Sequence, residues 1–118
     1  MMVDSLEMTE QDRDTIARNC QDVPEPHIVI THGTDTMVET ARVLAERVRG
    51  KTIVLTGAMI PIAFGSSDGL FNLGGALTAA QCLPPGVWIA MNGVLFPWDD
   101  VRKNRETGVF ERLDEAER

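Results

Sequence analysis

The stretch IVITHGTDT, residues 28–36, decides the fold that we expect for this chain. It opens with three β-branched residues, which are typical of a strand buried in a parallel sheet. The run ends at Gly33 and a helical pattern begins at Met37, so a strand passes almost directly into a helix. In open α/β sheets, ligands bind at the carboxyl ends of the strands. The hydroxyl of Thr34, the carboxylate of Asp35 and the backbone N–H groups of the helix that follows therefore mark a candidate reactive site.

The flanking segments alternate between helical and extended patterns. Thr9 and Asp12 resemble a capping box, which predicts that a helix begins there. We expect helices at about residues 9–19, 36–49 and 70–80, and strands at residues 27–31, 52–56, 87–91 and 94–96, the last as a hairpin arm. The unit over residues 28–56 is expected to be a right-handed βαβ crossover. This order predicts a three-layer, doubly wound α/β fold, that is, a Rossmann- or flavodoxin-like parallel sheet.

Two further segments are interpreted from their composition. The pair Gly74-Gly75 lies inside the third predicted helix, where each glycine costs roughly 1 kcal/mol against alanine. We interpret the pair as allowing a close approach of this helix to the sheet. Residues 111–118 are charged at six of eight positions and are expected to form a solvated helix or a frayed end.

Composition limits the classes of function. The chain has 118 residues, enough for one domain, and its net charge of −7 argues against a surface for nucleic acid or an anionic membrane. No apolar run reaches the roughly 18 residues of a membrane span, and the amino terminus has no signal-peptide pattern. A soluble, cytoplasmic protein is therefore expected. No metal site is predicted, and Cys20 and Cys82 are interpreted as reduced, buried thiols, with a disulfide left open.

Four motifs occur in a fixed order along the chain. They are THGTDT followed by Glu39-Thr40, TGAM with Pro61, SDG with Phe71-Asn72, and Asp100-Val101 with Lys103. Together they resemble the bacterial-type L-asparaginases, over residues 4–105, and an ordered set is far more specific than any single motif. The resemblance implies that residues 1–118 are part of an amino-terminal asparaginase-type α/β domain. It also implies an amidohydrolase that acts on asparagine or a similar ω-amide and needs no cofactor.

The resemblance assigns three residues to catalysis. Hydrolysis of an amide needs a nucleophile, a base and donors for the oxyanion. In the family, the threonine, aspartate and lysine matched by Thr34, Asp35 and Lys103 form one catalytic cluster. Thr34 is then expected to be the nucleophile or to activate water, Asp35 to fix the substrate amine and the lysine, and Lys103 to act as the base. From the residues alone, the same three could be a helix start, an acid in the first helical turn and a surface cation.

Three more residues are assigned to substrate binding. The hydroxyl of Ser5 matches the family position that holds the α-carboxylate of the substrate, and Ala58 would offer its backbone carbonyl to the substrate amide. Gly33 is counted with them, through a backbone requirement of close packing or positive φ. Asp68 and Asn72 are instead expected to tie down the loop and the start of the third helix.

The chain departs from the family pattern in one respect. Family members begin with a strand ending in Thr-Gly-Gly-Thr, whose threonine is the usual first nucleophile, and a mobile loop soon after it carries a tyrosine; this sequence has neither. We therefore expect the sheet to lack the family's first strand and the activity to be impaired. An open edge on the strand at residues 27–31 would favour a homo-oligomer. A non-catalytic amino-acid-binding module and an inactive truncated product are the alternatives, and the preference between asparagine and glutamine is left open.

Overall fold

The computed structural model describes residues 8–59 and 68–113. The expected order of helices and strands is confirmed, with ends that differ by a few residues. The elements are α1 (Glu10–Asp22), β1 (His27–Thr31), α2 (Met37–Arg47), β2 (Thr52–Thr56), α3 (Gly69–Cys82), β3 (Gly86–Met91), β4 (Val94–Pro97), β5 (Arg102–Lys103) and β6 (Phe110–Glu111).

The main sheet is mixed, in the order β1-β2-β3-β4. Strands β1, β2 and β3 are parallel, and Thr31 at the end of β1 is the register partner of Thr56 at the end of β2. Strand β4 is antiparallel to β3, which confirms the predicted hairpin arm. Asn92 and Gly93 both adopt a left-handed φ in the turn between them, as a tight hairpin with the right-handed twist of a sheet requires.

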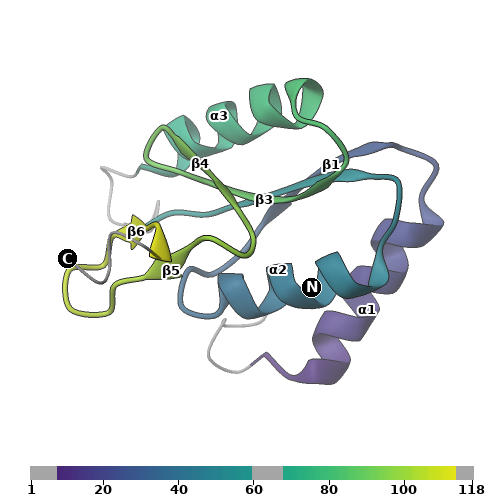
Figure 1. Cartoon of the computed structure of the whole chain (residues 1–118), viewed down its shortest axis with the longest axis horizontal. Helices are drawn as coiled ribbons and strands as arrows, with labels where there is room; N and C mark the ends of the chain where they lie inside the picture. Colours follow the sequence, from purple (N-terminus) through teal and green to yellow (C-terminus); the bar gives the residue numbers. More distant parts are fainter. Residues whose placement is uncertain (1–7, 60–67, 114–118) are drawn as a thin grey trace.

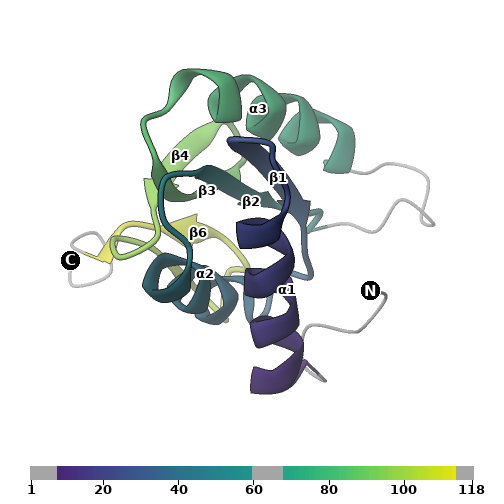
Figure 2. The ribbon, with the colours of Figure 1, turned by 90° about the vertical axis from the view of Figure 1, so that its right-hand side faces the viewer.

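Helices cover both faces of this sheet, in three layers (Figures 1 and 2). On the face of α1 and α2, Leu44 and its neighbours pack against Ile53 and Leu55 of β2. On the face of α3, Val54 of β2 packs against small helix residues such as Ala76. Because successive residues of a strand point to opposite faces, β2 is covered on both sides, and all five of its residues are buried.

The two parallel crossovers have opposite hands. Strands β1, β2 and β3 follow one another across the sheet, so two right-handed crossovers would place α2 and α3 on the same face. The two helices lie on opposite faces, so one crossover is left-handed (Figure 2). A right-handed crossover was predicted for the unit over residues 28–56 alone, and this hand can hold for only one of the two crossovers.

The interpretation of Gly74-Gly75 was wrong. A Cβ atom built at either glycine would meet no atom within 4 Å in the described structure, so neither glycine is needed for a close approach to the sheet. The helix makes that approach through its alanines, since Ala76, Ala79 and Ala80 are the residues buried against β2 and β3. Leu70 is 77% exposed, so the apolar character of α3 does not mark one buried face.

The prediction for residues 111–118 was wrong at its first residue. Glu111 belongs to β6, and its carboxylate accepts a hydrogen bond of 3.0 Å from Nε of Arg102 in β5. Residues 114–118 lie outside the described residues. By contrast, the capping box of α1 is present, with Thr9 and Asp12 each accepting a hydrogen bond from the other's backbone N–H.

Candidate functional site

A two-stranded hairpin holds Lys103 beside the main sheet. Strands β5 and β6 pair antiparallel, and the loop between them is closed by side-chain hydrogen bonds. The side chain of Asn104 accepts from the backbone N–H groups of Glu106 and Thr107, and Gly108 adopts a left-handed φ of 78°. Sequence reasoning missed this hairpin, although Asn104 and the pair Thr107-Gly108 are typical turn residues and could have indicated it.

The three residues expected to be catalytic lie in direct contact. Nζ of Lys103 donates hydrogen bonds of 2.8 Å to Oγ1 of Thr34 and of 2.8 Å to Oδ1 of Asp35. Thr34 and Asp35 lie between the end of β1 and the start of α2, so the β5–β6 hairpin brings its lysine to the carboxyl edge of the parallel strands. The side chain of Lys103 is only 12% exposed, whereas that of Asp35 is 36% exposed.

The charges around Asp35 keep it ionised. The hydrogen bond from Lys103 has the largest effect and lowers the pKa of the Asp35 carboxyl below its ordinary value. Burial acts against it, and the positive charges of Lys103 and Arg105 lower the pKa further. Arg105 also donates a hydrogen bond of 2.6 Å to the backbone carbonyl of Asp35. The cluster thus presents a hydroxyl, an amine and, at neutral pH, an ionised carboxylate on one open edge.

The loop after β2 leaves the sheet beside the loop that carries Thr34. Thr31 and Thr56 are register partners at the ends of β1 and β2. Gly33 lies two residues after Thr31, and Ala58 lies two residues after Thr56, so both follow neighbouring strands at the same edge of the sheet. Gly33 is exposed and Ala58 is half-buried, and both are therefore within reach of a ligand at this edge. Ser5, the third residue expected to bind substrate, lies outside the described residues.

Asp68 and Asn72 hold the loop after β2 in place. The amide group of Asn72 donates to the carbonyl of Gly57 at 2.8 Å and accepts from the backbone N–H of Asn92 at 2.9 Å. The carboxylate of Asp68 accepts from the backbone N–H of Met59 at 3.1 Å. These contacts agree with the expectation that both residues fix the loop and the start of α3.

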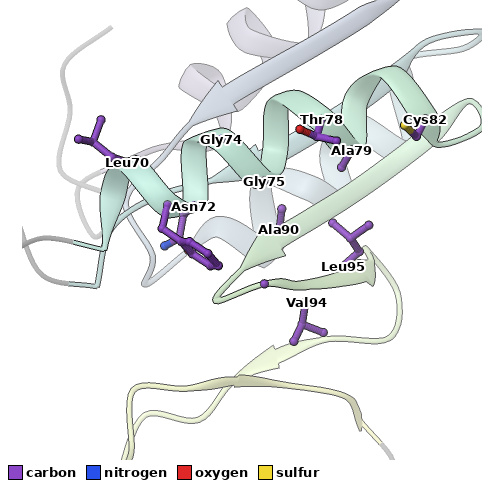
Figure 3. Close-up of a pocket in the computed structure, with 12 residues that line it drawn as sticks. Leu70, Asn72, Gly74, Gly75, Thr78, Ala79, Cys82, Ala90, Val94 and Leu95 are labelled. Carbon is purple, nitrogen blue, oxygen red and sulfur yellow. The ribbon is translucent and has the colours of Figure 1, made fainter.

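A large cavity of the described structure lies away from this cluster. It is a groove of about 620 Å³ between α3 and the β3–β4 hairpin, lined mostly by apolar side chains (Figure 3). Leu70 and Val94 are among the exposed residues of its rim, and Gly74 and Gly75 leave its floor open. Because a site for hydrolysis needs convergent polar groups, we place the candidate site at the Lys103 cluster and not in this groove.

Two other kinds of site find no support in the described residues. Within residues 8–59 and 68–113, no group of three His, Cys, Asp or Glu side chains could hold a metal ion. No helix in the same part of the chain is long and apolar enough to cross a bilayer.

Cys20 and Cys82 are both free thiols; Cys20 is buried as expected, whereas Cys82 is exposed.

Comparison with families and known proteins points to one family. The family model described as Asparaginase, N-terminal, matches residues 1–112. Over 118 residues the chain is 41% identical to an L-asparaginase of Dirofilaria immitis, covering 93% of this chain and 20% of that protein. It is 44% identical over 85 residues to L-asparaginase 2 of Escherichia coli K12, covering 69% of this chain and 24% of that protein.

A solved structure gives the same result. The thermostable L-asparaginase from Thermococcus kodakarensis matches with a TM-score of 0.85 and 34% sequence identity, covering 95% of this chain and 36% of that one. The chain also matches a human 60 kDa lysophospholipase, with 42% identity over 71% of this chain and 14% of that protein. In each of these comparisons the chain spans only part of its relative, from 20% to 36% of the length of the three asparaginases.

Proposed function

Because the chain belongs to the asparaginase family through its amino-terminal domain, we propose that it hydrolyses the side-chain amide of asparagine or a similar ω-amide. The products would be ammonia and the corresponding acid, aspartate in the case of asparagine. One observation carries this proposal: Nζ of Lys103 lies 2.8 Å from both Oγ1 of Thr34 and Oδ1 of Asp35. A hydroxyl held against an amine and a carboxylate is the arrangement that nucleophilic hydrolysis of an amide needs.

In the proposed mechanism, Lys103 and Thr34 share one proton. With its amine neutral, Lys103 accepts the hydroxyl proton while Oγ1 of Thr34, or a water that it orients, attacks the amide carbon. The C–N bond then breaks and the proton passes to the departing nitrogen, which leaves as ammonia. Attack by water gives the acid directly. Attack by Thr34 gives an ester on its Oγ1, which a water molecule then hydrolyses to release the acid and restore the hydroxyl. Arg105 keeps its positive charge throughout and lowers the pKa of the Asp35 carboxyl, so Asp35 stays ionised and can hold the amine of the substrate as well as Lys103.

The substrate would be held at the same edge of the sheet. We propose that Ser5 binds its α-carboxylate and that the backbone carbonyl of Ala58 accepts a hydrogen bond from its amide nitrogen. Gly33 would line the site through its backbone. These three assignments rest on the match to family motifs, and the exposure of Gly33 and Ala58 is compatible with them.

The proposal is tested by measuring ammonia and aspartate together after incubation with asparagine. We expect both products in equal amounts from the unaltered chain and neither from Lys103→Met. Arg102→Met is the matched control, because Arg102 precedes Lys103 in β5 but is 49% exposed and pairs with Glu111. Equal release from Lys103→Met and Arg102→Met would remove the lysine from the mechanism.

Calorimetry with asparagine separates the alternatives. A saturating heat of binding without release of ammonia would instead support a non-catalytic amino-acid-binding module. Neither binding nor turnover would support an inactive product.

A further inference from the structure

A chain of buried polar side chains lies beneath the loop that carries Thr34. Arg13 of α1 is 6% exposed, His32 after β1 is 9% exposed, and Thr40 of α2 is completely buried. Nε of Arg13 donates to Oγ1 of Thr40 at 3.0 Å, and that oxygen lies 2.8 Å from Nε2 of His32. Nδ1 of His32 lies 2.6 Å from the carbonyl oxygen of Gly33. Three elements of the fold therefore converge on one peptide group of the loop.

The donor and acceptor roles in this hydrogen-bond network follow from the chemistry of the two groups at its ends, the guanidinium of Arg13 and the carbonyl of Gly33. The carbonyl of Gly33 can only accept, so Nδ1 of His32 carries a proton. The guanidinium of Arg13 can only donate, so Oγ1 of Thr40 accepts from it. In a neutral imidazole Nε2 is then an acceptor. The hydroxyl of Thr40 can donate to it at 2.8 Å, whereas its other acceptor, Sδ of Met8, is weaker and lies at 3.6 Å. Nε of Arg13, the hydroxyl of Thr40 and Nδ1 of His32 then each have an acceptor, as buried polar groups require.

The surrounding charges favour the neutral imidazole. Burial lowers the pKa of His32, and the nearby charge of Arg13 acts in the same direction. The hydrogen bond to Gly33 and the carboxylate of Glu39 on α2 act against this effect. The carboxylate of Glu10 lies 3.3 Å from the guanidinium of Arg13.

The hydrogen-bond network of Arg13, Thr40 and His32 fixes the peptide group that precedes Thr34. The carbonyl of Gly33 and the N–H of Thr34 belong to one planar unit, so a bond that fixes the first also orients the second. The backbone of His32 is fixed as well, because its N–H donates to the carbonyl of Thr56 at 2.9 Å. Thr34 is thus held in place from beneath, while its hydroxyl accepts from Lys103 on the open side.

We propose that Arg13, Thr40 and a neutral His32 protonated at Nδ1 form a positioning relay that fixes the Gly33–Thr34 peptide and so aims the hydroxyl of Thr34 at Lys103. The effect on turnover rests on the proposed function, whereas the proton arrangement does not. None of the three residues is assigned a contact with the substrate, and the relay acts only through the loop.

Nitrogen NMR of the histidine rings tests the relay without any activity. His32 is expected to show a proton at Nδ1 alone, and to keep this state as the pH falls below about 6.5, the ordinary pKa of histidine. His27 is the internal reference, because it is the other histidine of the chain and is exposed. A ring of His32 protonated at Nε2 alone, or charged at neutral pH, would overturn the proposal.

Thr40 offers a matched pair of variants. Thr40→Val keeps the shape but removes the hydroxyl, and Thr40→Ser keeps the hydroxyl. We expect Thr40→Val to give His32 a mixture of ring tautomers and to lower kcat about tenfold with KM within a factor of two, which corresponds to about 1.4 kcal/mol in the barrier. Thr40→Ser should restore both the tautomer and kcat.

The outcomes separate the two proposals. Loss of kcat in Thr40→Val that Thr40→Ser fails to restore would leave Thr40 with a packing role only and would overturn the relay. Absence of turnover in the unaltered chain would contradict the proposed function, while the tautomer of His32 and its response to Thr40→Val would still decide the relay. Should Thr40→Val fail to fold, the ring state of His32 in the unaltered chain decides between the relay and its absence.

Discussion

Gly57 is a position at which a single added methyl group should be costly. It follows β2, and a Cβ atom built on it would lie 2.2 Å from the carbonyl oxygen of His32 and 3.3 Å from Cε of Met37. The side chain of Met37 can give way, but the carbonyl is backbone. The segment cannot shift freely, because the N–H of His32 donates to the carbonyl of Thr56, and the carbonyl of Gly57 accepts from Asn72.

The magnitude follows from the displacement that Gly57→Ala demands. The ends of β1 and β2 would have to separate by about 1 Å or more to restore an ordinary van der Waals distance. Overpacking of this kind costs roughly 1–3 kcal/mol, and a clash with backbone belongs at the upper end, so we expect a loss of about 3 kcal/mol. That is a large part of the roughly 5–15 kcal/mol of a typical domain.

Gly74→Ala is the matched control, with the same change of side chain and the opposite expected sign. Gly74 lies inside α3, and its added Cβ would meet no atom within 4 Å in the described structure. Because alanine favours the helix over glycine by roughly 0.5–1 kcal/mol, this variant should be more stable than the unaltered chain. Both variants are compared by urea unfolding monitored by circular dichroism. The dependence of the unfolding free energy on urea concentration should be the same in both variants and in the unaltered chain. Gly57→Ala at or above the original stability, or equal losses in both variants, would refute the reasoning.

Three further results are expected. Asp35→Asn should cost no more than about 1 kcal/mol at neutral pH, since Asp35 is partly exposed. The pKa of Asp35 in the folded protein lies below its ordinary 3.8. The unaltered chain should therefore exceed Asp35→Asn in free energy of unfolding by the full amount above pH 3.8, and this difference should vanish as the pH falls through the pKa of the folded state. Urea titrations at several pH values measure this difference in free energy of unfolding. A difference that grows in acid would contradict the prediction. Asn72→Ala should cost about 2–4 kcal/mol in urea unfolding, because it leaves the carbonyl of Gly57 and the N–H of Asn92 without their partner; a loss below about 1 kcal/mol would show that water replaces it. Sedimentation at several concentrations should show self-association through β1, which is an edge strand among the described ones, with slow hydrogen exchange at residues 28–31; a monomer with freely exchanging amides would contradict this.

Local signals in the sequence predicted the elements that build the site. The β-branched run of β1 and the capping box of Thr9 and Asp12 are each determined by residues close together in the chain, and both were found. The β3–β4 hairpin followed from Asn92 and Gly93, which favour a tight turn. Such features depend on backbone preferences within a few residues, so a single sequence is enough to predict them.

Features that depend on tertiary packing were not predicted. Arg13 carries the charge of a surface residue, and only the packing of α1 on α2 buries it against Thr40. Helix α3 has apolar residues on more than one side, so its sequence did not indicate which face meets the sheet. The contact of Lys103 with Thr34 joins residues 69 positions apart, and only the resemblance to a family suggested it.

We propose that Thr34 and Lys103 work as one catalytic unit, and a double-mutant comparison of ammonia release tests this most directly. Thr34→Ala, Lys103→Met and the double variant are measured with asparagine beside the unaltered chain. Residues that act as a unit lose their contribution together, so we expect the three variants to be equally slow and the double variant to be no worse than either single one. A rate in Lys103→Met equal to that of the unaltered chain, or losses that multiply in the double variant, would contradict the account.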